Sequence, residues 1–470
     1  MQDPSLVVVP YRYKATKLYS EIPITGVGDF TVGRLLNTAT RVNSDGNIEV
    51  VNANIPRLDY YTTGGVAGCP ALLVEPSGTN FILQSEAWNV SPWTATSGSQ
   101  GATVSGNVTT SPDGTTNADK LIEAAVTGNH FCLQTLTLTS GTTYTASFFV
   151  KASERTRGRV RTSGSGTPYW DIDFNLTLGT ITGGTNSFIQ NFGNGWYRIG
   201  ATFTANQASN NFILFLYDAS GNVSYTGDGT SGLFVWGAQI EVGSVATSYI
   251  PTTTGSVTRN ADVVNVSGAV SGLIGQTQGT IYAEFRYLGN PITRAGFVFL
   301  RQTGFRGLSI NFAPSDTPSG IVFISRNNSG TTSIQLTNGL TLGAYYKIAI
   351  AYDAGGTAAG GTQASGVTAY VNGSPATVSV GSLRVPDANL NEFRLYGANS
   401  GDENEVPNGN LRAAALYNSR LDDADLMVLT SPTYYSNVRD MIWDTFVART
   451  STFSELPGCL QTRHNELITL

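Results

Sequence analysis

The chain has 470 residues, which is too long for one small β-domain and suits two or three domains with substantial cores. Charged residues make up 13% of it, the formal net charge is −6 and no run of lysine and arginine occurs, so we expect no nucleic-acid partner, because phosphates require concentrated positive charge. The 53 glycines and an apolar fraction of 40% predict a folded all-β protein with many turns.

The N-terminal segment, residues 1–79, contains short strand-like pieces around 6–9, 48–51 and 71–74, separated by Gly and Pro. It has few bulky residues for a core, so we expect it to rest on the next domain or on a neighbouring protein. Met1 to Pro4 begin neither a basic nor an apolar signal region, and no run approaches the ~20 apolar residues that span a bilayer. These features predict a chain made in the cytoplasm, without membrane insertion.

Residues 80–262 alternate between apolar and polar side chains as strands do. Within 143–150, Tyr144, Ala146, Phe148 and Val150 share one face. A Gly-rich turn precedes a further apolar strand over 233–240. Strands at this spacing, without helical patterns between them, predict a β-sandwich.

Residues 263–430 predict a second β-sandwich, with alternating strands around 281–287 and 346–352. Asn372-Gly373 predicts a two-residue hairpin turn. Asp422 is positioned to cap a short helix, with Leu421 packing on Leu426.

Residues 431–470 differ in character from the rest. Val438, Met441, Ile442, Thr445 and Phe446 recur near helical spacing, which predicts a helix around 435–449 followed by an extended arm. We expect this tail to serve assembly.

Few residues suggest chemistry. Sugar binding needs flat aromatic faces and polar groups for the hydroxyls. Trp170 follows a Gly/Ser turn and is flanked by Tyr169, Asp171 and Asp173, so these four residues are the candidate glycan contact. The alternative is that Asp171 and Asp173 are solvated strand residues and that Trp170 packs in a core or against another subunit.

Catalytic residues are not predicted, because adjacent acids on one strand do not face each other across a bound sugar. No cofactor is expected, and a metal site is left open. The two histidines and three cysteines are not at metal-ligand spacing. The acidic loop 402–405 is expected to be solvated rather than to bind calcium, although its oxygens would suit that ion.

Several segments carry a resemblance to a known family. The run Val235-Trp236-Gly237-Ala238-Gln239-Ile240-Glu241 closes a series that includes 80–86, 118–121, 195–198 and 258–262. Together these segments resemble the carbohydrate-binding-like β-sandwich modules of tailed-bacteriophage structural proteins. The segments 39–46, 56–60 and 69–76 are similar to the leader that precedes such modules, and the likeness covers roughly 25–262. The order of strands in 263–430 resembles a laminin-G/concanavalin-like jelly roll.

The resemblance implies two jelly-roll-like sandwiches in a non-enzymatic virion surface protein, such as a fibre, spike or decoration component. It implies other virion proteins as partners, possible contact with cell-surface glycans, and a homo-oligomer, with a trimer favoured. Two alternatives stay open: a depolymerase of capsule or lipopolysaccharide, and a purely architectural connector.

Overall fold

The computed structural model describes most of residues 2–431. The residues outside the description are 1, 12, 62–66, 96–100, 165–166, 290–294, 303–305, 314–319, 339–340, 342, 355–365, 377–382, 385, 387–388, 398–406 and 432–470. Strands dominate the described part, which contains a single α-helix, α1 (Asp423–Thr430), and one short 3₁₀ helix, η1 (Ala269–Leu273). The predicted all-β class is therefore confirmed.

The first sandwich consists of two six-stranded sheets. One sheet contains, in spatial order, β10 (Thr94–Ala95), β14 (Phe131–Thr137), β21 (Ser209–Leu216), β16 (Arg157–Gly164), β17 (Thr167–Asn175) and β18 (Thr180–Gly183). The other contains β11 (Ala102–Thr109), β12 (Ala118–Glu123), β23 (Gly232–Val242), β15 (Thr143–Ala152), β20 (Trp196–Thr204) and β19 (Thr185–Gly193). The predicted alternation of β15 is confirmed, since Tyr144, Ala146, Phe148 and Val150 all enter the core between the sheets.

The second sandwich packs an eight-stranded sheet on a nine-stranded one. The eight-stranded sheet runs β33 (Ser374–Pro375), β32 (Val367–Val371), β31 (Tyr345–Asp353), β26 (Gln278–Gly289), β35 (Asn408–Tyr417), β8 (Ala71–Val74) and β7 (Leu58–Asp59), with β1 (Leu6–Val8) also paired to β35. The nine-stranded sheet runs β2 (Tyr13–Lys14), β3 (Lys17–Leu18), β4 (Phe30–Gly33), β25 (Val263–Ser267), β34 (Glu392–Gly397), β27 (Ala295–Gln302), β28 (Arg306–Ala313), β29 (Gly320–Asn327) and β30 (Gly330–Asn338).

The N-terminal segment contributes strands to both sheets of the second sandwich, although residues 80–262 separate the two in the sequence. Leu6 pairs with Leu416, and Val32 pairs with Val264. Leu6, Val8, Phe30 and Val74 are fully buried in the second core. Val42 and Ile48 of this segment do pack against Phe149, Trp196 and Trp236 of the next domain, as expected. The expectation did not foresee that the segment also completes the second sandwich within its own chain.

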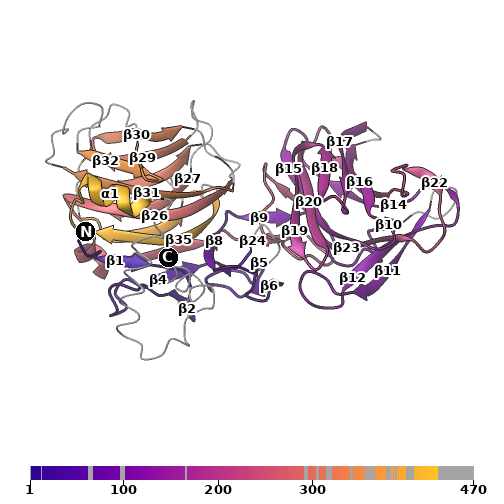
Figure 1. Ribbon diagram of the computed structural model, residues 1–470, viewed down its shortest axis with the longest axis horizontal. Coiled ribbons are helices and arrows are strands. Elements are labelled where there is room, and N and C mark those ends of the chain that lie inside the picture. Colours follow the sequence, from indigo (N-terminus) through magenta and orange to yellow (C-terminus); the bar gives the residue numbers. More distant parts are fainter. Residues whose placement is uncertain are drawn as a thin grey trace, which may run out of the picture.

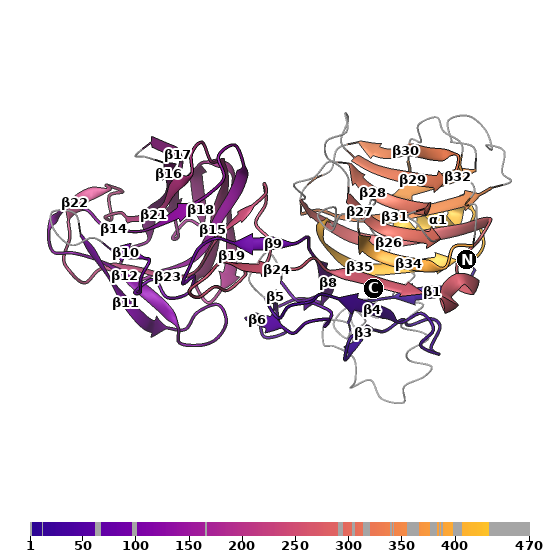
Figure 2. The same ribbon diagram turned by 180° about the vertical axis from the view of Figure 1, so that it is seen from behind.

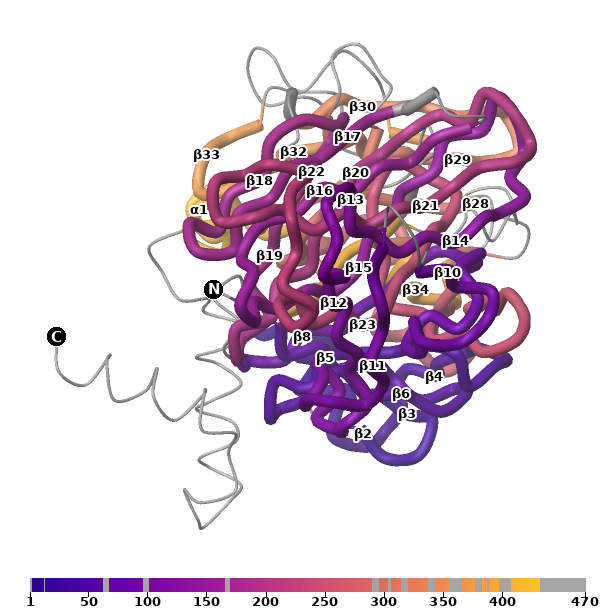
Figure 3. The backbone as a smooth tube through the Cα atoms, turned by 90° about the vertical axis from the view of Figure 1, so that its right-hand side faces the viewer, coloured from indigo at the N-terminus to yellow at the C-terminus, as the bar shows by residue number. Residues whose placement is uncertain are grey.

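The two sandwiches lie side by side along the long axis of the molecule, with the N-terminal strands along one side of the second (Figures 1 and 2). Figure 3 views the molecule end-on, with the first sandwich in front. Two short pairs of strands lie where the two sandwiches meet. They are β9 (Gly78–Asn80) with β24 (Val257–Arg259), and the hairpin of β5 (Ala39–Val42) with β6 (Ile48–Val51). A further pair, β13 (Thr127–Asn129) with β22 (Ser224–Thr226), lies in the first sandwich.

Two local predictions are confirmed in the second sandwich. Asn372 and Gly373, between β32 and β33, both have positive φ, as a type I′ turn requires. The Asp422 side chain caps α1 by accepting a 2.8 Å hydrogen bond from the amide of Asp425, while Leu421 and Leu426 are buried in one cluster. The helix predicted around 435–449 and the loop 402–405 lie outside the described residues.

Candidate functional site

The structure places the predicted stacking residue Trp170 in the core of the first sandwich. Its side chain is 8% exposed and meets Phe203 edge-on, with ring centroids 6.2 Å apart. Trp170, Ile172 and Phe174 occupy alternate positions of β17 and all point inward. The expectation of an exposed stacking face at Trp170 is therefore wrong, because the period of two continues through it. Tyr169 lies on β17, but its side chain is outside the described residues.

Asp171 and Asp173 lie on the opposite, outer face of the same strand. Each forms a bidentate ion pair with an arginine of the neighbouring strand β16. Arg161 donates to Asp171 at 2.7 and 2.8 Å, and Arg159 donates to Asp173 at 2.7 and 2.9 Å. The Tyr217 hydroxyl donates to Asp173 at 2.7 Å. These carboxylates are thus held by cross-strand arginines at a half-exposed surface, and their contact with glycan hydroxyls stays a prediction.

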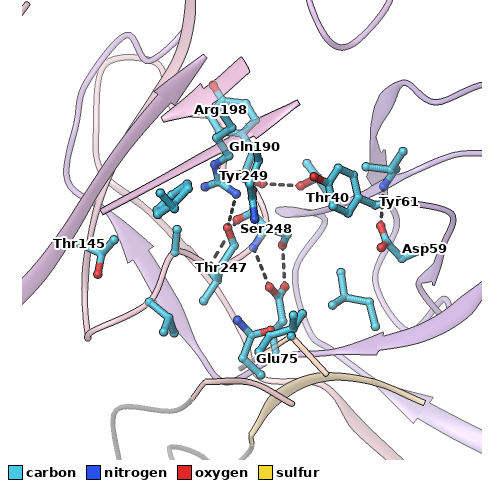
Figure 4. Close-up of a pocket in the computed structure, with 18 of the residues that line it drawn as sticks. Thr40, Asp59, Tyr61, Glu75, Thr145, Gln190, Arg198, Thr247, Ser248 and Tyr249 are labelled. Atoms are coloured by element: carbon cyan, nitrogen blue, oxygen red, sulfur yellow. Dashed lines mark hydrogen bonds between the residues drawn. The ribbon is translucent and has the colours of Figure 1, made fainter. Parts of the chain in front are cut away.

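A cavity of about 500 Å³ lies where the two sandwiches and the N-terminal segment meet (Figure 4). Its walls combine aromatic rings, amides and charged groups drawn from all three parts of the chain. The residues used below are Asp59, Tyr61, Glu75, Phe149, Gln190, Phe192, Arg198, Ser248, Arg286, Asn408 and Asn410. Such a concave, mixed surface is the usual form of a small-ligand site.

The first wall is the outer face of the sheet that contains β15, β19 and β20. Phe149, Arg198 and Gln190 lie opposite one another in register on these neighbouring strands. Because side chains alternate along a strand, the residues that face away from the sandwich core on this sheet face the cavity instead. The fold therefore presents one aromatic ring, one guanidinium and one amide in a row.

Arg198 is the buried cation of this wall, with 6% of its surface exposed. It donates to the Thr247 carbonyl at 2.8 Å and to the Ser147 hydroxyl at 3.0 Å, and its guanidinium lies 5.5 Å from the Phe149 ring centre. Among the described residues it forms no ion pair within 4.0 Å, and its Nε has no hydrogen-bond partner. Burial lowers its pKa, with Glu241 and Glu75 opposing that effect.

The second wall comes from the N-terminal segment. The Tyr61 ring stacks on Phe192 with centroids 5.0 Å apart and an interplanar angle of 27°. Asp59, at the end of β7, accepts a 2.9 Å hydrogen bond from the amide of Val42. Burial raises the pKa of Asp59 to about 6, and the nearby Glu75 adds to the rise.

A buried ion network supports these two walls. Glu75 pairs with Arg57 at 2.5 Å and with Arg259 at 3.2 Å, and Asp262 pairs with Arg57 and with Arg34, the latter at 2.8 Å. Although burial opposes ionisation, Arg259 and Arg57 hold the pKa of Glu75 at about 2. The network ties the N-terminal segment to the stretch that links the two sandwiches.

Glu75 also accepts hydrogen bonds from the amide and the hydroxyl of Ser248, each at 2.6 Å (Figure 4). Its two oxygens are therefore fully engaged. A carboxylate in this state is fixed in place and remains ionised.

The third wall comes from β26 and β35 of the second sandwich. Arg286 and Asn410 lie opposite one another in register, and Asn408 lies two residues before Asn410 at the start of β35. The Asn408 side-chain oxygen and the Arg286 Nε are buried without a hydrogen-bond partner in the described part of the chain. This wall therefore adds a second guanidinium and two amides to the cavity.

Several of these residues lie in the sequence motifs described above, but the sequence did not indicate that they form a site. Arg57, Glu75, Arg259 and Asp262 all lie within the motifs that carry the phage-module resemblance. The one signal that was available is Glu75, a charged residue at the end of the apolar run 71–74. What the sequence does not reveal is that segments about 200 residues apart meet at one point.

The described residues contain neither a metal-type cluster of side chains nor a membrane-spanning helix. Within those residues no group of three or more His, Cys, Asp and Glu side chains is arranged to hold a metal ion. None of the helices described is long and apolar enough to cross a membrane.

Comparison with known proteins gives only distant structural likenesses. No family model matches the chain, and a search of curated proteins gives no match. The CBM40 domain of the Ruminococcus gnavus IT-sialidase is similar at 13% identity and a TM-score of 0.28, over 35% of this chain and 88% of that one. Domain 4 of AbnA, a GH43 arabinanase from Geobacillus stearothermophilus solved with arabinotriose, gives 15% identity and a TM-score of 0.29, over 40% and 82%.

A leech intramolecular trans-sialidase gives 17% identity and a TM-score of 0.29, over 36% of this chain and 27% of that one. TM-scores this low assign neither a ligand nor an activity to this protein.

Proposed function

We propose that this chain is a non-enzymatic glycan-binding protein on the outer surface of a tailed-bacteriophage particle, as a fibre, spike or decoration component. The cavity between the sandwiches is the observation that carries glycan binding. The assignment to a virion rests on the motif resemblance over roughly 25–262.

The cavity has the groups that bind sugars. A sugar ring offers an apolar face that packs on an aromatic ring, while its hydroxyls bond to amides and charged groups. Tyr61, Phe149 and Phe192 supply the rings, and Gln190 and Asn410 supply amides. The volume of about 500 Å³ is typical of sites for small ligands.

Glycan binding without cleavage is favoured by the state of the carboxylates in the cavity. Glycoside hydrolysis needs two carboxylates that face the bond from either side, one of them free to donate a proton and the other to attack or to activate water. Glu75 is 1% exposed, and its oxygens are engaged by two arginines and Ser248. It is therefore not available for attack, and Asp59 stands alone as a free carboxylate among the cavity residues named above.

Glycan binding is tested with the full chain on an array of bacterial surface glycans, followed by titration of the best ligand. We expect Gln190→Ala to weaken binding severalfold, because its amide faces the cavity. Gln207→Ala is the matched control, since Gln207 is an equally half-buried amide of the first sandwich outside the cavity. Absence of binding to any glycan contradicts the proposal and favours the purely architectural connector.

The virion assignment is tested on intact phage particles with antibodies against the folded chain. We expect immunogold labelling of the particle exterior by electron microscopy. Absence of the chain from purified particles contradicts this part of the proposal, whatever the glycan result.

A depolymerase is the second candidate, and one observation favours it. Burial raises the pKa of Asp59, which lines the cavity, to about 6, and a carboxyl with a raised pKa is suited to donate a proton at neutral pH. Incubation of the chain with host capsule or lipopolysaccharide distinguishes the candidates. Release of oligosaccharides that Asp59→Asn abolishes establishes the depolymerase; absence of release supports binding alone.

A further inference from the structure

We propose that the cavity between the sandwiches selects acidic glycans, and that Arg198 and Arg286, from two of its walls, bind the carboxylate of a uronic-acid or sialic-acid residue. This inference rests on the proposed function and names the ligand class of the same site. It is argued from the balance of buried charge at the cavity, from the free donors of the two arginines and from the rings around them.

The balance of buried charge leaves a positive excess at the cavity. Apart from the pair of Arg41 and Glu49, the ionisable groups buried or half-buried at the junction include the arginines Arg34, Arg57, Arg198, Arg259 and Arg286 and the carboxylates Asp59, Glu75, Glu241 and Asp262. These guanidinium groups outnumber these carboxylates by one. Arg34, Arg57 and Arg259 each form an ion pair, whereas Arg198 and Arg286 form none within 4.0 Å among the described residues, although the charge of Glu241 acts on Arg198.

A buried charge without a partner is costly, and an incoming anion removes that cost. Arg198 uses two of its five N–H donors on Thr247 and Ser147, and its Nε is free among the described residues. A carboxylate accepts two parallel N–H bonds from such a guanidinium, and this geometry makes the pair strong and specific. Arg198 therefore has both the charge and the donors to bind a carboxylate.

Arg286 brings a second positive charge from the other sandwich. It contacts the Tyr345 ring at 5.9 Å, and no hydrogen bond or ion pair engages its guanidinium within the described residues. Arg286 and Arg198 both act on Tyr61, whose pKa burial raises and these two positive charges lower. Both guanidinium groups therefore line the same cavity as Tyr61 and lie close enough to act on it.

The rings beside the arginines point to a sugar as the carrier of the carboxylate. Phe149 lies under the Arg198 guanidinium, and Tyr61 and Phe192 stack beside it. A fully hydrated inorganic anion gains nothing from such apolar faces, whereas the ring of an acidic sugar covers them. Gln190 and Asn410 remain to bond the hydroxyls.

Besides the tyrosines Tyr61 and Tyr249, the other ionisable groups that line the cavity are Asp59, Arg41 and Glu75. Glu75 is paired with Arg57 and Arg259, and Arg41 is paired with Glu49 at 2.6 Å. Of the two carboxylates, Asp59 is the one without an ion pair among the described residues; it accepts a hydrogen bond from the Val42 amide and lies on the same wall as Tyr61. It repels the ligand when ionised, so we expect acidic sugars to bind more tightly at pH 5 than at pH 8.

The test is titration calorimetry on the full chain with two matched pairs of probes. One pair is an oligogalacturonide and its carboxyl-reduced form; the other is sialyllactose and lactose. We expect the acidic member of at least one pair to bind at least about tenfold more tightly than its neutral counterpart, and rising salt to weaken that binding. The pair that responds identifies the uronic or the sialic source.

Arg286→Gln is the diagnostic variant, because this half-buried side chain makes no hydrogen bond on which the fold depends. We expect it to weaken acidic-sugar binding by about tenfold or more, which corresponds to the loss of one charge-assisted contact. Arg326→Gln is the matched control: Arg326 is also a half-buried arginine of the second sandwich but lies outside the cavity. Equal melting temperatures of the two variants establish that Arg286→Gln folds normally.

Each result decides the inference. Equal binding of acidic and neutral members, or unchanged binding in Arg286→Gln, overturns it while the proposed glycan-binding function stands. Binding that survives Arg286→Gln but is lost in Asp171→Asn with Asp173→Asn moves the site to the outer face of β17 and also overturns it. No binding of any probe here, together with no binding on the glycan array, overturns both the inference and the proposed function.

Discussion

Arg57 holds together parts of the chain that meet at the junction between the two sandwiches. It joins Glu75 of the N-terminal segment to Asp262 of the linking stretch and is 1% exposed. Removing one member of such a network leaves the other charges buried and unpaired. We expect Arg57→Met to lower the free energy of unfolding by about 3–5 kcal/mol, measured by chemical denaturation.

Arg161→Met is the control for that change, since it breaks an ion pair at a half-exposed surface. Asp171 keeps its ion pair with Arg159 at 3.3 Å and stays open to water, so we expect a loss below about 1 kcal/mol. Equal losses in the two variants would contradict the view that burial gives the junction network its importance.

Glu86 is expected to make the stability of the folded chain depend on pH. Burial, and then the charge of Asp113, raises its pKa from 4.5 to about 7. Between these values the folded state retains a proton that the unfolded state has released, so stability falls as pH rises from 5 to 8. We expect Glu86→Gln to reduce that fall in melting temperature; part of it remains, because the pKa of Asp59 is also raised, to about 6.

Glu154→Gln is the control for the pH experiment. The Lys120 side chain, by hydrogen bonding to Glu154, lowers the pKa of that carboxyl to about 2, so its contribution to stability is lost only as pH falls below its unfolded value of 4.5. We expect the melting temperature of this variant to depend on pH between 5 and 8 as that of the unmodified chain does. If Glu86→Gln behaves like Glu154→Gln, Glu86 does not titrate in this range.

At the scale of single elements, local chemistry was predictable and distant pairing was not. The alternation in β15, the Asn372-Gly373 turn and the Asp422 cap depend on residues close in sequence, and each is present as predicted. The pairing of β1 with β35 joins residues about 410 positions apart and has no local signal. The cavity depends on the same kind of distant meeting, so its residues were visible in the sequence but their convergence was not.

Trp170 shows how a neighbouring feature can mislead within an element. The Gly/Ser turn before it suggested exposure, while its spacing from Ile172 and Phe174 indicated the core, and the spacing prevailed. We expect Trp170→Ala to lower the free energy of unfolding by about 3–5 kcal/mol, because it leaves a large cavity in the core.

Thr180→Ala, on the neighbouring strand β18, is the control for Trp170→Ala. Thr180 is exposed, so its loss changes stability by no more than about 0.5 kcal/mol. Denaturation monitored by tryptophan fluorescence and by circular dichroism measures both variants. A loss below about 1 kcal/mol for Trp170→Ala would contradict its place in the core.

At the scale of the whole molecule, the N-terminal segment is part of the second sandwich and not an appendage. It buries Leu6, Val8, Phe30 and Val74 completely and pairs with β25 and β35. Without it, both sheets lose strands and the core is opened to water. We expect a chain lacking residues 1–79 to be insoluble or to lose its cooperative thermal unfolding, and a folded, soluble product with an unchanged melting temperature would contradict this.

The pairing of the N-terminal segment within its own chain bears on how copies of the protein assemble. We predicted docking through both ends of the chain, yet β1, β4 and β8 already have partners within the same molecule. The tail, residues 432–470, lies outside the described residues, so our prediction that it joins copies rests on its apolar residues at helical spacing. Phage fibres of the resembled class imply a trimer. We therefore expect light scattering to give the mass of three chains for the full protein and of one chain for a protein that ends at residue 431. A single-chain mass for both would contradict assembly through the tail, and a threefold mass for both would place the contact on the sandwiches themselves.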